Sequence, residues 1–235
     1  RGDKNALLSY EIPDRSIDEQ LYIVDILGSI DEKIENNLSF KKTILQFGLR
    51  LFEQISNLGG EKRGCGELFT FINGYAFKSG DYRTNGDHKV ITIKNITDDG
   101  FNSANADTID YTDIYTKSLL HIGDILLTMT GEVGRVGIVD IDNALLNQRV
   151  LKVISPSPFF TYFSLLSHST AIKSLAKGSV QQNLGIKELA NYSIECNDIE
   201  NYKQYDWIIN KLLIISKENS KLNELKQLYL KKFFG

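Results

Sequence analysis

The longest regular pattern of apolar and polar positions in this 235-residue chain lies between Ser16 and Leu58. Apolar residues recur there at alternating steps of three and four, the spacing of a helix that packs along one face. Ser16 and Glu19 form a capping-box pattern, and Gly59-Gly60 favours a helix end. We therefore predict one helix over this stretch, on the order of 60 Å long at ~1.5 Å per residue. Its packed face would comprise Ile23, Leu27, Ile30, Ile34, Asn37, Lys41, Ile44, Gly48, Leu51 and Ile55.

A weaker copy of this pattern lies near the C-terminus. A strand-like segment at residues 7–12 precedes the first helix, and a similar segment around Tyr192 precedes a second helical pattern. Equivalent positions of the two copies are 182 residues apart, which indicates an internal repeat. The second helix is the natural partner of the first, and we expect the two to form an antiparallel coiled coil. Its face would comprise Tyr205, Ile208, Leu212, Ile215, Asn219, Leu222 and Tyr229.

An asparagine lies in the face at the same place in each copy, Asn37 in the first and Asn219 in the second. A buried asparagine at such a position costs stability but fixes the register of two helices. We interpret the two residues as a helix-helix registry pair. The alternative is that each simply faces solvent.

Between the helices the pattern changes to short β-branched or alternating runs separated by glycine and Asn/Asp turns. Runs at 90–93, 124–128 and 150–154 predict strands, residues 61–66 read as a polar linker, and 159–177 is the one clear helical stretch. The fold class is therefore α+β, one α+β domain flanked by two long helices. The predicted division is 1–60 for a strand and spacer helix, 61–198 for the central domain and 199–235 for the second helix.

Composition narrows the function classes. The net charge of −3 and the pI of about 5.7 argue against a whole-surface nucleic-acid binder but allow a local basic face. No apolar run approaches the ~20 residues that span a bilayer, and residues 1–11 lack the apolar core of a signal peptide, so we expect a cytoplasmic protein. Cys65 and Cys196 lie in no CxxC or Cys/His cluster and are expected to be inert thiols. The sequence shows no acid-base, nucleophilic or metal-ligating set, so no catalytic residue and no metal ligand is predicted.

The side chains that could carry chemistry gather in four predicted loops of the central domain. These are rich in Asn, Gln, Arg, Lys and Thr, the residue types that bond base edges and phosphates. The loops contain Phe71–Lys78, Thr92–Thr97, a glycine-rich run that leads to Leu145–Val150, and Gly178–Lys187. The candidate DNA-binding residues are Tyr75, Lys78, Lys94, Asn95, Thr130, Arg135, Asn147, Gln148, Arg149, Gln181, Gln182, Asn183 and Lys187.

Four segments, in this order, resemble the target recognition domain of a type I restriction-modification specificity (S, or HsdS) subunit. They are INGYAFK, the GDIL…TMTG…G…G run, LLNQRV and GS-x-QxNL. The IP…EQ…I..IL..ID helix resembles the conserved region of the same family. The resemblance covers nearly the whole chain, and its strength lies in the ordered set. The chain departs from the family's usual plan in having one recognition domain, which suggests a half-subunit form or a fragment.

The resemblance implies a non-catalytic DNA-recognition subunit. Two recognition domains, spaced by the paired helices, would read the halves of an interrupted double-stranded DNA site. A homodimer of half-subunits would match a symmetric site. Methyltransferase (modification) subunits would dock on the helices, and restriction subunits would join them. S-adenosylmethionine, ATP and Mg²⁺ are expected on those partners, with no cofactor in this chain.

Several alternatives stay open at this stage. Tyr75 could stack on DNA or pack into the core, and Asn147, Gln148 and Arg149 could read bases or shape a turn before the strand at 150–154. For the whole chain, the competing hypothesis is a coiled-coil scaffold that presents a globular domain to a protein partner.

Overall fold

The structure is a computed structural model that describes residues 14–178 and 182–235. Its helices are α2 (Ile17–Ser56), α3 (Cys65–Leu68), α4 (Pro158–Ser167), α5 (Ser169–Ser174), α6 (Ile186–Asn191), α7 (Glu200–Lys203) and α8 (Trp207–Phe234), with 3-10 turns η1 (Ser79–Asp81), η2 (Ile93–Asn95) and η3 (Asp113–Ser118). Its strands are β1 (Glu61–Gly64), β2 (Thr70–Asn73), β3 (Tyr82–Arg83), β4 (His88–Ile91), β5 (Ile96–Thr97), β6 (Gly100–Phe101), β7 (Asp107–Ile109), β8 (Leu119–Leu120), β9 (Ile125–Thr128), β10 (Val136–Ile138), β11 (Ala144–Leu146), β12 (Val150–Ile154) and β13 (Ser193–Cys196).

Two compact units make up the chain. The helical unit contains the described residues up to Lys42 together with Ile215–Gly235, and the mixed unit is Thr43–Ile214. This division follows packing and falls inside α2 and α8. The boundaries predicted at residues 60 and 198 follow changes of secondary structure instead, so the two divisions describe different properties of the chain.

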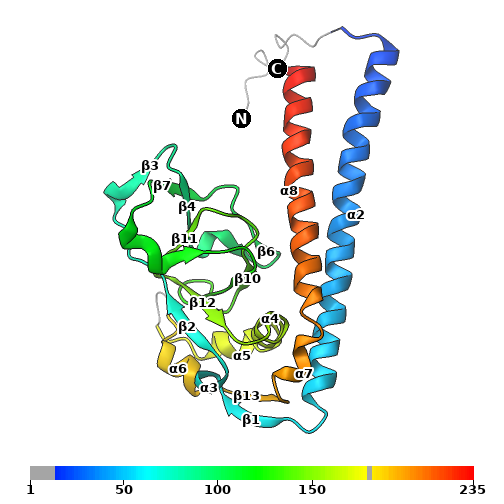
Figure 1. Ribbon diagram of the computed structural model, residues 1–235. Helices are drawn as coiled ribbons and strands as arrows, with labels where there is room; N and C mark the ends of the chain where they lie inside the picture. Colours follow the sequence, from blue (N-terminus) through cyan, green and yellow to red (C-terminus); the bar gives the residue numbers. More distant parts are fainter. Residues whose placement is uncertain (1–13, 179–181) are drawn as a thin grey trace. The chain divides into compact units, whose positions relative to one another are not determined.

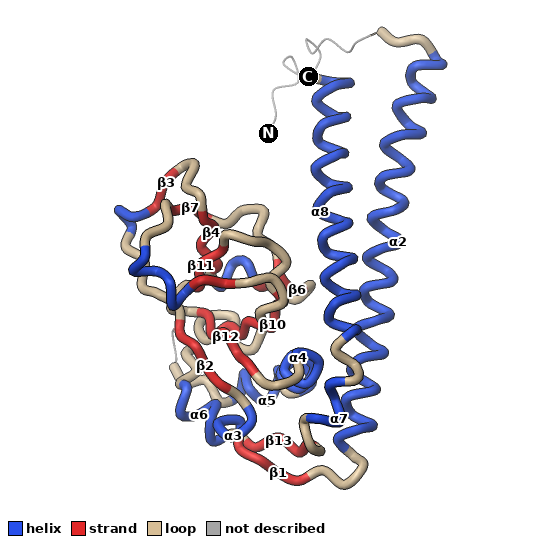
Figure 2. Tube along the Cα trace, in the orientation of Figure 1, coloured by secondary structure: helices blue, strands red, loops and turns tan. Residues whose placement is uncertain are grey.

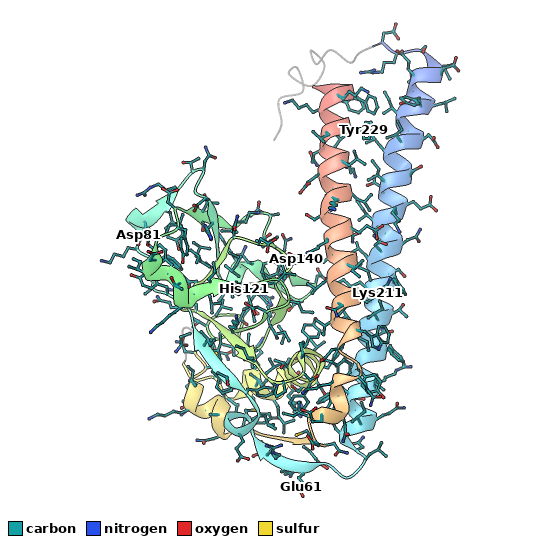
Figure 3. The ribbon with its side chains drawn as sticks, viewed as in Figure 1. Glu61, Asp81, His121, Asp140, Lys211 and Tyr229 are labelled. Atoms are coloured by element: carbon teal, nitrogen blue, oxygen red, sulfur yellow. The ribbon has the colours of Figure 1, made fainter. Side chains whose placement is uncertain are left out.

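In the helical unit, α2 and α8 run side by side in opposite directions (Figure 1). Tyr22, early in α2, meets Phe233 near the end of α8, with ring centroids 6.3 Å apart. Further along, Asn37 lies opposite Asn219, and its Nδ2 donates to the Asn219 Oδ1 at 2.8 Å. Tyr229, labelled in Figure 3, stacks on Phe233 at 5.6 Å. The predicted α+β class with an antiparallel pair of long helices is confirmed.

The local signals at the start of α2 are also confirmed. The Ser16 Oγ accepts a hydrogen bond from the Glu19 backbone N–H at 3.3 Å, and the Glu19 carboxylate accepts one from the Ser16 N–H at 3.1 Å. Both bonds join residues three apart, so the helix start is determined locally. Every residue of the predicted face of α2 is buried or half-buried, and the helix ends at Ser56, before Gly59 at φ +87°.

The mixed unit holds two main sheets and two short strand pairs. The four-stranded sheet has the order β10-β9-β12-β2, and the five-stranded sheet has the order β3-β7-β4-β11-β8. Short strands joined by long loops are visible in Figure 2. Helix α4 packs against β9, β10 and β12 and brings three buried phenylalanines to the core, Phe159, Phe160 and Phe163. The strands predicted at 124–128 and 150–154 are confirmed as β9 and β12, whereas the run predicted at 90–93 is a strand only up to Ile91, the end of β4, because Ile93 begins the η2 turn.

Three predictions from the sequence were wrong in detail. Residues 61–66 are not a linker, because Glu61–Gly64 forms β1 and pairs antiparallel with β13. The stretch 159–177 forms two helices that meet at His168, whose ring Nδ1 lies 2.9 Å from the Ser164 carbonyl oxygen. The second long helix begins at Trp207, after the separate α7. The strand expected at 7–12 lies outside the described residues.

Tight packing of α2 against α4 explains Gly48. A Cβ at this position would lie 2.2 Å from the Phe163 ring, and that ring is fully buried. Gly28, also inside α2, has no atom within 4 Å of its added Cβ. Gly28 can therefore accept a side chain, whereas a side chain at Gly48 would collide with the Phe163 ring.

We expect Gly48→Ala to lower the free energy of unfolding by about 1–3 kcal/mol, because the buried ring cannot move away from the new methyl group. Gly28→Ala is the matched control, and it is expected to raise that free energy by ~0.5–1 kcal/mol through better helix propensity. Urea denaturation of both variants measures this. Equal effects of the two substitutions would contradict the packing argument.

Candidate functional site

Three neighbouring strands of the four-stranded sheet have an end on the same side of the sheet, which we call its edge. Strands β2 and β9 finish there, and β12 starts there. In the antiparallel registers, Asn73 at the end of β2 faces Leu151, and Thr128 at the end of β9 faces Val150 at the start of β12. The loops that follow β2 and β9 and the loop that precedes β12 therefore leave the sheet on the same side. Two of the four predicted loops, Phe71–Lys78 and the glycine-rich run that leads to Leu145–Val150, therefore meet there.

Residues 147–149 are the crossing between the two main sheets, because they join β11 of one sheet to β12 of the other. The loop after β2 is bonded to this crossing. The Tyr75 N–H donates to the Leu146 carbonyl oxygen at 2.8 Å, and the Gln148 N–H donates to the Tyr75 carbonyl oxygen at 3.0 Å. A Cβ at Gly74 would lie 2.3 Å from the Leu146 carbonyl oxygen, so this approach requires glycine.

The remaining loops join the crossing through further backbone bonds. The Met129 N–H donates to Arg149 at 3.0 Å, the Leu184 N–H donates to Met129 at 2.8 Å, and the Gly131 N–H donates to Gln182 at 3.0 Å. Asn147 is also tied to the end of β4, since its N–H donates to the Ile91 carbonyl oxygen at 3.0 Å. We call residues 74–78, 129–131, 147–149 and 182–184 the loop surface.

Within the crossing, the three side chains differ in exposure. Asn147 is only 9% exposed, and its Oδ1 accepts a hydrogen bond from the Arg149 N–H at 3.1 Å. This is an Asx-type turn, in which the amide shapes the backbone. Gln148 and Arg149 are exposed, and Arg149 forms no ion pair within the part of the chain that the structure describes. The turn thus exposes the Gln148 amide and the Arg149 guanidinium on the surface.

Two predicted site residues turn their side chains into the protein. Asn95 is 1% exposed; its Oδ1 accepts from the Thr92 N–H at 2.9 Å and its Nδ2 donates to the Asn102 carbonyl oxygen at 3.1 Å. The half-buried Tyr75 ring packs edge-on against Phe77 and Tyr115, at centroid distances of 5.1 and 5.0 Å. Asn95 therefore supports its own loop, and Tyr75 contributes to the loop surface mainly through its backbone.

The other predicted residues lie on or beside the loop surface. Thr130 forms an isolated bridge with Asn183. Lys78, Gln182, Asn183 and Lys187 are exposed, and Lys78 precedes the η1 turn, where Asp81, labelled in Figure 3, accepts its backbone N–H at 2.9 Å. Gln181 lies outside the described residues. Lys94 pairs with Asp107 at 2.7 Å, and Arg135 pairs with Asp98.

The sequence analysis missed Lys177. Its backbone forms two bonds of 2.9 Å with Asn183, so it is held against the last of the predicted loops. Its Nζ pairs with the Glu188 carboxylate at 2.9 Å, which lowers the pKa of Glu188. The signal was present in the sequence, since Lys177 directly precedes the Gly178 turn of the GS-x-QxNL segment.

The arrangement offers hydrogen-bonding groups rather than reactive ones. Burial raises the pKa of the Cys65 thiol to about 12, and burial also raises the pKa of Cys196, so both thiols stay protonated near neutral pH. In residues 14–178 and 182–235 no group of three or more His, Cys, Asp or Glu side chains is placed to hold a metal ion. None of the helices in these ranges is long and apolar enough to cross a bilayer.

Comparison with known proteins adds a family and a fold. Residues 59–231 match the family model described as "Type I restriction modification DNA specificity domain". No curated protein matches the chain.

Three solved structures are similar. The S subunit of a type I restriction-modification system from M. genitalium is 21% identical over 62% of this chain and 37% of that chain, with a TM-score of 0.45. The HsdS subunit from Thermoanaerobacter tengcongensis is 16% identical over 95% and 60%, with a TM-score of 0.48. A chain from a structural study of assembly and conformational transition of the type I R-M system is 16% identical over 95% and 60%, with a TM-score of 0.52, and shares the fold. The present chain thus spans at most 60% of these chains.

The Asx turn predicts different outcomes for two adjacent substitutions. Asn147→Ala is expected to lower the free energy of unfolding by about 1–2 kcal/mol, because the Arg149 N–H loses its acceptor at a nearly buried turn. Gln148→Ala, at the exposed neighbour, is the control and is expected to change stability by less than ~0.5 kcal/mol. Chemical denaturation compares them, and a neutral Asn147→Ala would remove the structural role of that amide.

Proposed function

The chain belongs to the family of type I restriction modification DNA specificity domains, and from this we propose that it is the non-catalytic sequence-reading part of such a system. Its substrate contact is double-stranded DNA. Its role is to direct partner methyltransferase and restriction subunits to an interrupted DNA site.

The observation that carries this proposal is the convergence of loops at one sheet edge. Segments separated by up to about a hundred residues in sequence are joined there by backbone hydrogen bonds into one loop surface. Such a surface can hold several side chains in fixed relative positions, which is what direct readout of base edges requires. Loops supported by two sheets also suit a family whose members differ in the sequence they read.

We assign roles from exposure and partners. Gln148 and Arg149 have the side chains that bond adenine and guanine edges and are both exposed at the crossing, so we assign them to base readout. Gln182, Asn183 and Thr130 form the second reading group, and Gln181 remains a candidate by its place in the same segment. Lys78, Lys94, Arg135 and Lys187 would contact phosphates. Asn147, Asn95 and Tyr75 would hold the loops.

The partners follow from the family. The paired helices of the helical unit would receive the methyltransferase subunits, and restriction subunits would join that assembly. S-adenosylmethionine, ATP and Mg²⁺ would be bound by those partners. The assembly would act in the cytoplasm, where its DNA substrate is found.

An interrupted site has two halves, so a second recognition domain is required. A second copy of the chain can supply it in a homodimer, and two-fold symmetry would then match a palindromic site. A further domain of the same polypeptide would serve equally. Selection of bound sequences from random DNA, with the chain and its methyltransferase partner together, distinguishes the two, because only the homodimer requires two identical half-sites.

Arg149→Ala is expected to weaken binding to the selected site by ~1–3 kcal/mol and to relax preference at one base pair, because a bidentate guanine contact would be lost. Lys78→Ala is the control: it should weaken binding to all sequences alike and reduce the slope of log K against log salt by about one. Fluorescence anisotropy with specific and random duplexes measures both. Unchanged site binding by Arg149→Ala would remove its assignment.

The same titration separates the proposal from a protein scaffold. A DNA reader loses affinity steeply as salt rises and keeps a preferred sequence. A scaffold for a protein partner would show neither property.

We also propose that Asn37 and Asn219 set the register of the helical hairpin. They are equivalent positions of the repeat, Asn37 is 5% exposed, and its Nδ2 donates both to Asn219 at 2.8 Å and to the Glu218 carboxylate at 2.9 Å. Because equivalent residues face each other, the bond lies where a local two-fold axis would relate the two helices.

Asn37→Leu is expected to cost about 1–3 kcal/mol, because the Asn219 amide is left opposite an apolar side chain. The double variant Asn37→Leu/Asn219→Leu is expected to regain most of that stability while losing the single register. Denaturation gives the coupling energy, and cysteine cross-linking between the helices reports register. Additive single effects with one cross-linking pattern would contradict the registry role.

A further inference from the structure

Arg135 lies at the same edge as the loop surface. Its backbone pairs with Thr128, whose N–H donates to the Arg135 carbonyl oxygen at 3.0 Å, and Thr128 in turn faces Val150. Arg135 is thus two strands away from the residue that follows Arg149, on the order of 10 Å at ~4.8 Å per strand. Both arginines are placed where a nucleic-acid backbone at this edge would pass.

The guanidinium of Arg135 is already bound to a carboxylate through its Nε–Nη2 face. Its Nε donates to the Asp98 Oδ1 at 2.8 Å, and its Nη2 donates to the Asp98 Oδ2 at 3.0 Å. Glu132 lies 3.6 Å from the same group. The bond to Arg135 lowers the pKa of Asp98 and raises the pKa of Arg135, so both stay charged around neutral pH.

Asp98 comes from a separate hairpin. It follows β5 and precedes β6, and its side chain is 83% exposed, whereas that of Arg135 is 26% exposed. Asp98 therefore contributes little to the core and reaches over to cover a cation at the candidate interface. Two other cations of this region have the same kind of partner, Lys94 with Asp107 and Lys177 with Glu188.

Asp98 occupies one of the two faces through which a guanidinium binds an anion in a bidentate way, the Nε–Nη2 face, and it offsets the positive charge that would attract a phosphate. To contact DNA through this face, Arg135 must exchange one anion for another, and through its Nη1 donors it approaches DNA with its charge already balanced by Asp98, so the net gain is small. The exchange also needs a phosphate that lies in the plane of the Arg135 guanidinium. A complex locked in register by base contacts provides that alignment, whereas a loosely placed complex on random DNA does not.

We propose that Asp98 is a specificity-determining residue that acts as an internal competitor for phosphate. It holds Arg135 in complexes with random DNA and releases it to the backbone when the loop surface is seated on its site. This inference rests on the proposed DNA-reading function. Asp98 would thus affect sequence preference without contacting a base.

The test is a double-mutant cycle with the full chain, alone and with its methyltransferase subunit. Asp98→Asn is expected to tighten binding to a random duplex by about threefold or more at low salt, and to steepen the salt slope by ~0.9, the value of one phosphate contact. Binding to the selected site is expected to change less, so the ratio of specific to random affinity falls. Thermal unfolding checks that each variant is folded.

Two comparisons separate this effect from a general change of charge. Asp142→Asn removes the same charge from an exposed turn that precedes β11, at the opposite end of β10 from Arg135. It is expected to leave the affinity ratio unchanged. In an Arg135→Ala background, Asp98→Asn is expected to lose its effect, because the guanidinium it would release is gone.

The competitor role fails if Asp98→Asn and Asp142→Asn act alike, or if Asp98→Asn keeps its effect without Arg135. It also fails if specific and random affinity rise by the same factor. These outcomes differ from failure of the proposed function, in which the unmodified assembly itself shows no preferred DNA sequence.

Discussion

The close approach of Gly74 to the backbone of Leu146 and Asn147 is the constraint on which the loop surface depends. The crossing between the two sheets is only three residues long, and the Tyr75 amide is bonded directly to it. No side chain fits at Gly74, because its Cβ would meet a carbonyl oxygen at 2.3 Å. Backbone bonds of this kind are insensitive to side-chain identity, so the exposed residues of the crossing can vary while the loops stay in place.

Within the mixed unit, a second set of contacts joins the end of α2 and the segment before α8 to α4. Phe52 of α2 and Phe160 of α4 pack with Tyr202, and the Tyr202 hydroxyl lies 3.0 Å from the Ser56 Oγ. Asp206 supports the start of α4, since its carboxylate accepts from the hydroxyl of the N-cap Ser157 at 2.7 Å and from the Phe159 N–H at 2.9 Å. Aromatic packing and capping together fix α4 beneath the four-stranded sheet. The loop surface is therefore carried on a well-packed support.

Ion pairs on the surface explain how a chain with a negative net charge fits the proposed role in binding DNA. A net charge of −3 does not describe the local surface, because several basic side chains are matched one to one with carboxylates. Exposed pairs of this type contribute little to stability. Their larger effect is on association, since a paired cation attracts DNA less than a free one. Weak general attraction would suit the proposed DNA-reading role, in which the protein must leave random sequences quickly.

Signals carried by neighbouring residues were readable in the sequence. The helix start at Ser16, the packed face of α2 and the strands β4, β9 and β12 depend on contacts or periodicities within a few residues. The loops that carry the candidate residues were also identifiable from composition. Contacts between distant residues were not: β1 exists only because residues 193–196 pair with it, and Tyr75 turns inward against Tyr115, which lies in another segment. Tertiary structure alone decided which side chains of the loops face outward, because their burial depends on the whole chain, whereas periodicity predicts burial only along a regular helix or strand.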